Sequence, residues 1–260
     1  MNYLKVRIVR GMAIGMFVGW LLGSCSSSYS LVGVEGGRVA ITRQYDNHSD
    51  AEAFKILRPY QQKVDSIMSP VIGHSAMSMS AFRPESPLSN LIADVLRQAG
   101  ETAIGKPVDV AVMNMGGIRN AMPEGEITFG TIYEIAPFEN ALCVLTMDGA
   151  TLEELFKQIA SVHGEGLSGA TLQIDAQGHL LEARVNGRPV EAKKVYTVAT
   201  IDYLAEGNDK MGAFRNAQSK LFPKDALLRS LLLDYVKKCE QKGQFVSSQV
   251  EGRIKVNASN

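Results

Sequence analysis

The chain has 260 residues, enough for one or two domains, and its composition of 45% apolar and 21% charged residues is that of an ordinary globular protein. Its formal net charge at pH 7 is zero. No excess of basic side chains therefore argues for nucleic-acid binding, and we expect no nucleic-acid partner.

Residues 1–24 have the pattern of a secretory signal peptide. Lys5, Arg7 and Arg10 form a positively charged segment, and a short apolar run at residues 11–23 follows it. A run of this length spans a bilayer poorly, which favours a cleaved signal. An uncleaved anchor remains the alternative.

Leu22-Gly23-Ser24-Cys25 resembles a lipobox, in which the cysteine is acylated and becomes the mature N-terminus. Three serines after Cys25 would supply a flexible tether. Two or three acyl chains would then hold the protein at a membrane, because a single chain anchors only marginally. In a bacterium with two membranes, serine rather than aspartate after the cysteine resembles the sorting pattern for the outer membrane. We therefore expect the protein to be anchored there, facing the periplasm.

Residues 25–50 are expected to hold the lipidated tether and the first strands. The segment from residue 29 to 43 alternates weakly between apolar and polar side chains. It predicts a hairpin turn at residues 34–38 and a strand at residues 38–43.

Residues 51–260 are predicted to form one α+β domain, because helical periodicity mixes with runs of short hairpin strands. Asp50 or Ser49 can cap its first helix, which ends near Met68. The other predicted helices are 87–100, 131–136, 151–163 and 224–239, and the predicted strands are 71–79, 108–114, 141–147 and three or four short ones within 171–199.

The stretch between Asn114 and Asn140 carries the most informative polar pattern. An apolar run stops at Gly116-Gly117, where a backbone without Cβ atoms can approach a ligand closely. Arg119 adds five fixed donors, and Phe138 adds an aromatic face. One aromatic face, two amides and one guanidinium suit a flat heteroaromatic ring with polar substituents. A glycine turn with a surface arginine and a core phenylalanine would give the same pattern.

Several motifs, taken in order, resemble the C-terminal substrate-binding domain of the bacterial 5′-nucleotidase and UDP-sugar hydrolase family. They are PESPLSNLIADVLRQA at residues 84–99, NMGGIR at 114–119, PEGEIT at 123–128, PFEN at 137–140 and TIDYLAEGNDKMGAF at 200–214. The match covers about residues 68–214. It implies a single 5′-nucleotidase C-terminal-like domain with mixed sheets and flanking helices.

The resemblance also implies a set of substrate-binding residues. Phe138 and Tyr203, where the family usually has phenylalanine, would stack on the two faces of a base. Asp209 would accept hydrogen bonds from ribose hydroxyls, and an arginine near Arg83 would join Arg119 in holding the substrate. The complete set is Arg83, Asn114, Gly117, Arg119, Phe138, Asn140, Tyr203 and Asp209.

The loop at residues 207–210 departs from the family pattern. Gly207-Asn208-Asp209-Lys210 stands where Gly-Gly-Asp-Gly is usual. If a replaced glycine needs a positive φ, asparagine tolerates that conformation best and lysine tolerates it poorly. The departure therefore bears on the shape of the loop and on base specificity.

In the resembled family, phosphate hydrolysis belongs to an N-terminal domain whose two metal ions are held by dense motifs of His, Asp and Asn. This chain has 4 histidines, scattered singly, and only residues 46–50 resemble one such motif in passing. We therefore expect no catalytic residue and no metal or other cofactor in this chain. The resemblance places a divalent metal pair on a partner phosphatase domain.

These patterns predict the nucleotide- or nucleoside-binding half of a 5′-nucleotidase, which takes part in nucleotide catabolism with a separate metallophosphatase and is inactive alone. A stand-alone nucleoside-binding lipoprotein without catalysis is one alternative. A structural lipoprotein that has lost its ligand is another. The intact NMGGIR and PFEN motifs argue against that last alternative, and the altered loop at residues 207–210 argues for it.

Overall fold

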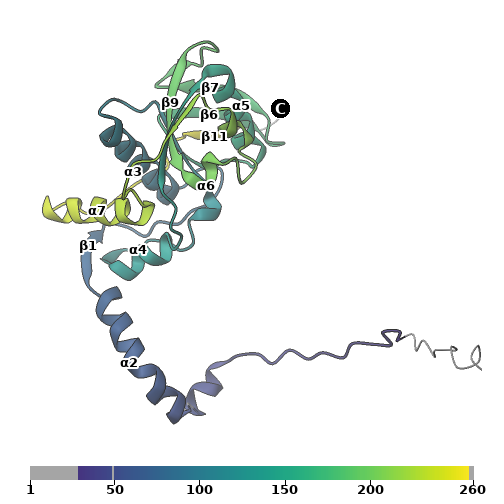
Figure 1. Cartoon of the computed structure of the whole chain (residues 1–260), viewed down its shortest axis with the longest axis vertical. Coiled ribbons are helices and arrows are strands. Elements are labelled where there is room, and N and C mark those ends of the chain that lie inside the picture. The colour runs from purple at the N-terminus through teal and green to yellow at the C-terminus, as the bar shows by residue number, and fades with distance from the viewer. Residues whose placement is uncertain (1–28, 49, 258–260) are drawn as a thin grey trace, which may run out of the picture. The chain divides into compact units, whose positions relative to one another are not determined.

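The computed structural model describes residues 29–48 and 50–257. The predicted signal peptide and Cys25 lie outside the described residues. The chain divides into two units, residues 1–54 and 55–260. The second unit holds all three β-sheets of the described chain and every predicted substrate-binding residue (Figure 1).

The described part of the first unit has little regular structure. Residues 29–42 form neither helix nor strand, and a 3-10 helix, η1 (Arg43–His48), follows them. The hairpin turn and strand predicted at residues 34–43 were therefore wrong, and apolar side chains such as Val39 and Ile41 are exposed. A lone strand leaves its backbone N–H and C=O groups without partners, so weak alternation by itself does not form one.

Helix α2 (Ala51–Met68) begins where the sequence predicted. Asp50 Oδ1 accepts hydrogen bonds from the backbone N–H groups of Glu52 at 2.9 Å and Ala53 at 3.1 Å, which confirms Asp50 as the cap. Every side chain from residue 51 to 67 is exposed. The helix therefore contributes almost nothing to the hydrophobic core.

A five-stranded mixed sheet forms the centre of the second unit. Its order is β10 (Ser219–Leu221), β4 (Leu142–Asp148), β9 (Val195–Ile201), β2 (Val110–Met113) and β5 (Gly166–Ser168). β2 and β9 are parallel, and the other neighbours are antiparallel. The three inner strands are almost entirely buried, which explains their continuous apolar and β-branched sequences.

Two smaller sheets complete the strand structure. One pairs β1 (Val71–Ser75) with β3 (Gly125–Thr128), and the other has the order β11 (Ile254–Asn257), β6 (Ala170–Asp175), β7 (Leu180–Val185) and β8 (Arg188–Pro189). The predicted hairpin at Asn186-Gly187 joins β7 to β8, with positive φ at both turn residues. The short strands β3, β5, β10 and β11 were not predicted, because their hydrogen-bond partners lie far along the chain.

Helices flank these sheets as expected for an α+β fold. They are α3 (Pro87–Ile104), α4 (Phe129–Ile135), α5 (Gly149–Ser161), α6 (Asp202–Ala205) and α7 (Leu228–Gln241), with short 3-10 turns η2 (Met115–Gly117) and η3 (Gly212–Asn216). α3 packs on the central sheet and against α7, and α5 contacts both the central and the four-stranded sheet (Figure 1). The predicted fold class, with mixed sheets and flanking helices, is confirmed.

Helix α3 is longer than the sequence predicted. A capping box between Ser86 and Ser89 starts it, and Gly105, with φ 65°, ends it. The predicted end at Gly100 was wrong, because that glycine lies on the buried face. A Cβ on Gly100 would lie 3.1 Å from the Cβ of Ala199. The glycine therefore permits close packing of helix on sheet and does not terminate the helix.

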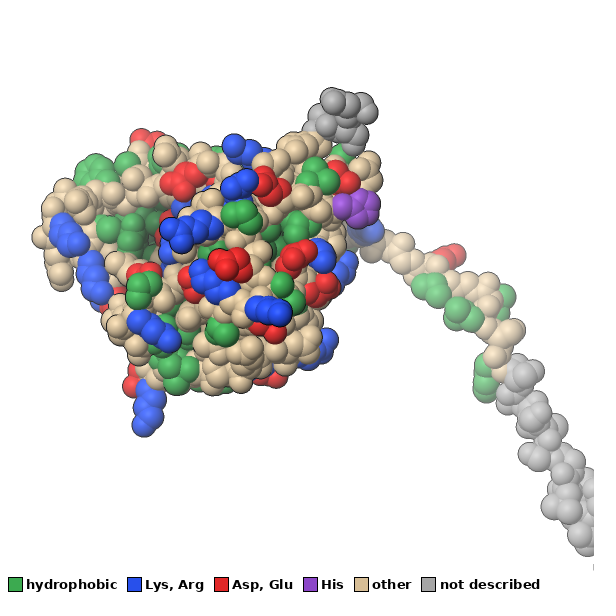
Figure 2. All heavy atoms as spheres, turned by 90° about the horizontal axis from the view of Figure 1, so that it is seen from above, with side chains coloured by type: hydrophobic (Ala, Val, Ile, Leu, Met, Phe, Trp, Pro, Cys, Tyr) green, Lys and Arg blue, Asp and Glu red, His purple; other side chains and the backbone are tan. Residues whose placement is uncertain are grey.

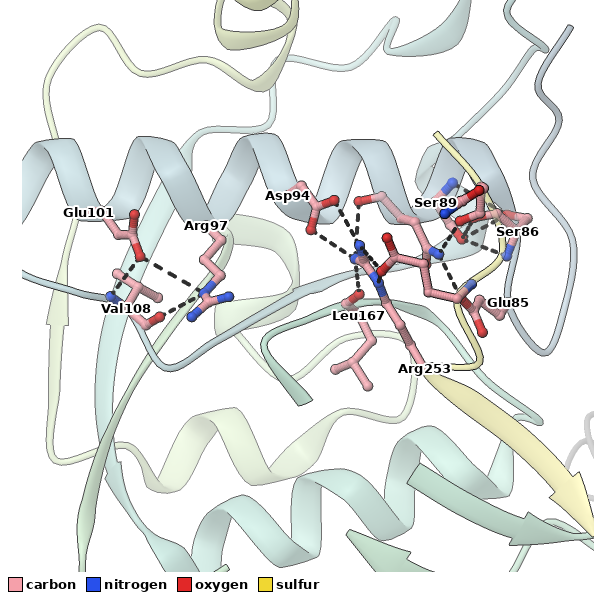
Figure 3. Close-up of polar contacts among 12 residues, drawn as sticks. Glu85, Ser86, Ser89, Asp94, Arg97, Glu101, Val108, Leu167 and Arg253 are labelled. Atoms are coloured by element: carbon pink, nitrogen blue, oxygen red, sulfur yellow. Dashed lines mark hydrogen bonds and ion pairs between the residues drawn. The ribbon is translucent and has the colours of Figure 1, made fainter. Parts of the chain in front are cut away.

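A polar network joins the C-terminal segment to the start of α3 (Figure 3). The buried carboxylate of Glu85 accepts hydrogen bonds from the backbone N–H groups of Glu251 at 2.7 Å and Ile254 at 3.3 Å. The guanidinium of Arg253 donates to both carboxylate oxygens of Asp94 at 2.8 Å. We call Glu85, Asp94 and Arg253 the anchor network, because they fix the start of β11 to α3.

The surface carries both signs of charge in close mixture. On the face shown in Figure 2, basic and acidic side chains are interspersed, without a broad area of positive charge. This pattern agrees with the formal net charge of zero.

Candidate functional site

The motif loops meet at one edge of the central sheet. β2 runs parallel to β9, with Ala111 opposite Ala199, and β4 runs antiparallel to β9, with Leu142 opposite Ile201. The carboxyl ends of β2 and β9 and the amino end of β4 therefore lie side by side. The loops that leave β2 and β9 and the loop that enters β4 are the segments that carry the sequence motifs.

These loops enclose a cavity of about 310 Å³. Its walls consist of Gly116 and six of the eight predicted binding residues, namely Asn114, Gly117, Phe138, Asn140, Tyr203 and Asp209. A volume of roughly 300 to 1,000 Å³ is typical of small-molecule sites. The fold thus gathers residues from distant parts of the chain into one pocket, which we call the motif pocket.

The two aromatic residues of the motif pocket are half-exposed rather than packed in the core. Phe138 is 48% exposed and Tyr203 is 43% exposed, whereas Phe156 and Phe214 are fully buried. Neither residue is a core aromatic, which excludes the alternative of a core phenylalanine at position 138. A large ring kept at the edge of a cavity is available for stacking on a planar ligand.

Asp209 is held between two donors in the pocket wall. The hydroxyl of Tyr203 donates to Asp209 Oδ1 at 3.0 Å, and the amide nitrogen of Asn114 donates to Asp209 Oδ2 at 2.5 Å. The hydrogen bond from the Tyr203 hydroxyl to Asp209 and the negative charge of Asp209 raise the pKa of Tyr203 above its ordinary value. The phenol is therefore fixed as a neutral donor, and the carboxylate orientation is set before any ligand binds.

The side-chain oxygen of Asn114 is a second polar feature of the wall. Asn114 is buried, and its Oδ1 has no hydrogen-bond partner among the described residues. A Cβ on Gly117 would lie 2.8 Å from this oxygen and 2.6 Å from Cε of Met113. Glycine is therefore required at position 117 for the asparagine to keep its place. A buried acceptor without a donor is a position where a ligand N–H or O–H group can bind.

The altered loop keeps a left-handed backbone at three of its four residues. Gly207 has φ 80°, Asp209 has φ 52° and Lys210 has φ 66°. Asn208, the residue best suited to positive φ, instead donates from its side chain to the carbonyl of Tyr203 at 2.8 Å. The altered sequence therefore places backbone strain at Lys210, a non-glycine residue with positive φ at a position where the family usually has glycine. Despite the substitution, Asp209 still faces the cavity.

The two predicted arginines lie outside the pocket wall. Arg83 forms an ion pair with Glu165, and Arg119 donates from Nη1 to the carbonyl of Gly116 at 3.0 Å. Both guanidiniums thus support the loop that follows β2 rather than line the cavity. That both arginines hold the substrate directly stays a prediction.

Glu165 is a residue of this site that the sequence analysis missed. Its side chain is 2% exposed, and its carboxylate binds both the Arg83 guanidinium and the backbone N–H of Met115. Burial raises the pKa of Glu165 above its ordinary value, opposed by the Met115 N–H and the charge of Arg83. The available signal was a single acidic residue between two glycines, in the stretch GEGLSG.

Two further properties concern the described part of the chain. Its side chains contain no group of three or more His, Cys, Asp or Glu residues placed to hold a metal ion. None of the helices described in the structure combines the length and the apolar character needed to cross a membrane.

Two curated relatives each match more than half of this chain. Endonuclease YhcR of Bacillus subtilis is 35% identical over 164 residues, which are 60% of this chain and 13% of that protein. The trifunctional nucleotide phosphoesterase protein YfkN, also from Bacillus subtilis, is 27% identical over 236 residues, or 81% of this chain and 16% of that protein. The chain thus spans less than a fifth of either relative.

A solved structure shows the same fold. The 5′-nucleotidase precursor from Thermus thermophilus superposes with a TM-score of 0.70 at 26% identity, covering 80% of this chain and 43% of that one. The family model described as 5′-nucleotidase, C-terminal domain, matches residues 70–216, which include every residue of the motif pocket. With more than half of its length matched by that model and the same fold observed, the chain belongs to the 5′-nucleotidase C-terminal domain family.

Proposed function

We propose that the motif pocket binds the nucleoside part of a nucleotide and that this chain is the binding half of a 5′-nucleotidase-type hydrolase. The observation that carries the proposal is the cavity itself, which is lined by two half-exposed aromatic side chains and by a carboxylate held in place by hydrogen bonds. The cavity of about 310 Å³ suits a nucleoside in size, and its lining suits the flat base and the hydroxyl donors of the ribose.

Each pocket residue has a role that its chemistry supports. Phe138 and Tyr203 stack on the base, which is worth roughly 1–3 kcal/mol per base. Asp209 accepts hydrogen bonds from ribose hydroxyls with the lone pairs that Tyr203 and Asn114 leave free. Asn114 Oδ1 and the amide of Asn140 then bind polar groups of the ligand.

Hydrolysis of the phosphate ester belongs, in this proposal, to a metallophosphatase unit separate from this domain, which holds a divalent metal pair. The name of the relative YfkN, a trifunctional nucleotide phosphoesterase of which this chain spans 16%, supports such a division of labour. The purified chain with Mn²⁺, Co²⁺ or Zn²⁺ is then expected to release no phosphate from AMP above background. Phosphate release that copurifies with the chain and is lost in His48→Ala would contradict this assignment.

We further propose that Cys25 carries the lipid anchor and that the protein works at the outer membrane, facing the periplasm. The lipobox-like sequence before Cys25 supports this location. Mass spectrometry of the mature N-terminus decides the point, since an acylated Cys25 is expected and a soluble protein that starts at another residue would refute it.

Isothermal titration with adenosine and uridine tests the binding site. Wild type is expected to bind a nucleoside, and Phe138→Ala is expected to weaken binding by roughly ten- to a hundredfold, because one stacking face is lost. Phe222→Ala is the matched control, since Phe222 is also 48% exposed and does not line the motif pocket. If wild type binds no nucleoside at millimolar concentration, the alternative of a structural protein that has lost its ligand is favoured.

A further inference from the structure

The wall of the motif pocket carries a negative charge and no positive one. Of the described residues that line the cavity, Asp209 is the only one with a formal charge at pH 7. Its carboxylate accepts hydrogen bonds from Tyr203 and Asn114. A nucleotide phosphate carries a charge of about −1.5 to −2 at pH 7, so this wall repels it.

Arg83 does not offset that repulsion, because its charge is already matched. The guanidinium binds the carboxylate of Glu165, whose side chain is 2% exposed against 40% for Arg83. The same carboxylate is fixed by the backbone N–H of Met115, the residue before Gly116 of the pocket wall. A buried carboxylate at hydrogen-bond distance cancels most of the field of its arginine for a second anion.

The exposed charges on the surrounding loops also balance. Arg119 and Lys210 are exposed cations, and Glu139 is an exposed anion between Phe138 and Asn140. The cations Arg83, Arg119 and Lys210 are matched in number by the carboxylates Glu139, Glu165 and Asp209. Exposed charges are further screened by salt, so these exposed side chains add little attraction for a phosphate.

We propose that the motif pocket prefers an uncharged nucleoside to its 5′-monophosphate, and that Glu165 sets this preference by holding Arg83 in an internal ion pair. The proposal rests on the proposed function, since it requires a nucleoside in the pocket. Glu165 is a positioning residue, because it contacts Arg83 and the Met115 amide rather than the ligand. When a nucleotide is bound, its phosphate then lies outside this wall, and its counter-charge comes from the metallophosphatase unit.

Titration of the full chain with adenosine and with AMP, at low and at high salt, measures the preference directly. Wild type is expected to bind AMP at least about tenfold more weakly than adenosine at low salt, the size of one unfavourable charged contact. The difference in affinity between adenosine and AMP is expected to shrink at high salt, because repulsion between exposed charges is screened. Equal or tighter binding of AMP would overturn the proposal while leaving nucleoside binding intact.

Two variants test the role of Glu165. Glu165→Gln keeps an acceptor for the Met115 amide but releases the Arg83 charge, so the AMP-to-adenosine affinity ratio is expected to rise about tenfold. The double variant Glu165→Gln/Arg83→Gln removes the released charge and is expected to restore the wild-type ratio. Glu182→Gln, which breaks the ion pair with Arg184 outside the pocket wall, is the matched control and is expected to leave the ratio unchanged.

These experiments distinguish failure of nucleoside binding from failure of the role proposed for Glu165. If neither ligand binds wild type, the proposed function fails, and this proposal fails with it. If adenosine binds but Glu165→Gln leaves the ratio at its wild-type value, Glu165 does not set the preference. Thermal unfolding of each variant shows whether it is folded. If Glu165→Gln does not fold, the wild-type ratio and its salt dependence still decide the preference.

Discussion

The anchor network and the motif pocket are both polar, yet they use their polar groups in opposite ways. In the anchor network, Glu85 is buried and the side chain of Arg253 is only 12% exposed, and each binds several groups on other segments. In the motif pocket, Asp209 is held by two donors beside open aromatic faces, and Asn114 Oδ1 has no partner among the described residues. Satisfied buried groups stabilise a fold, whereas groups that are fixed but left open can bind a ligand.

The largest expected effect comes from breaking the anchor network. Glu85→Ala leaves the buried N–H of Ile254 and the partly buried N–H of Glu251 without an acceptor and is expected to lower the free energy of unfolding by about 3 kcal/mol. Glu85→Gln keeps an acceptor oxygen and should lose clearly less. Urea denaturation followed by circular dichroism measures both. An alanine variant as stable as wild type would mean that the network is not a structural anchor.

A change in the motif pocket should show the reverse pattern. Phe138→Ala, which is expected to weaken nucleoside binding by roughly 1–3 kcal/mol, should change the free energy of unfolding by less than about 0.5 kcal/mol, because the ring is half-exposed. The same denaturation experiment checks this. A loss of stability as large as that of Glu85→Ala would show that Phe138 belongs to the core, and the contrast between the two regions would disappear.

The strained residue of the altered loop offers a smaller test. Lys210→Gly should stabilise the fold by roughly 0.5–1 kcal/mol, because relief of the left-handed backbone outweighs the entropy that glycine loses on folding. Lys193→Gly, at an exposed turn residue without positive φ, serves as the control and should be neutral or destabilising. A destabilised Lys210→Gly would show that the lysine side chain makes a contribution larger than the strain.

The smallest expected effect is the pH dependence of the Glu165 pair. Because burial raises the pKa of Glu165 in the folded state, its contribution to stability is full below the ordinary value of 4.5 and is lost as the pH rises through the folded-state pKa. The stability advantage of wild type over Glu165→Gln should therefore fall as the pH rises from about 4.5. Denaturation curves across that range test the sign, and an advantage that grows with pH would contradict it.

Some features of the fold were predictable from sequence because they depend on neighbours along the chain. The Asp50 cap, the Asn186-Gly187 hairpin and the apolar strands β2, β4 and β9 are set by local propensity and pattern. The strand predicted at residues 38–43 did not form, since local alternation cannot supply the partner strand that its backbone requires.

The residues of the motif pocket were named from sequence, because contiguous motifs fix residue types and their order along the chain. The pairing of those residues was decided only by the tertiary structure. Asn114 meets Asp209 across 95 positions, because parallel β2 and β9 bring their loops to one sheet edge. Arg83 meets Glu165 across 82 positions, and Glu165 is brought beside the loop after β2 because β5, which follows it, pairs with β2. A single sequence does not show which charges neutralise one another. Whether Arg83 is open to a phosphate or already paired with Glu165 was therefore decided by folding alone.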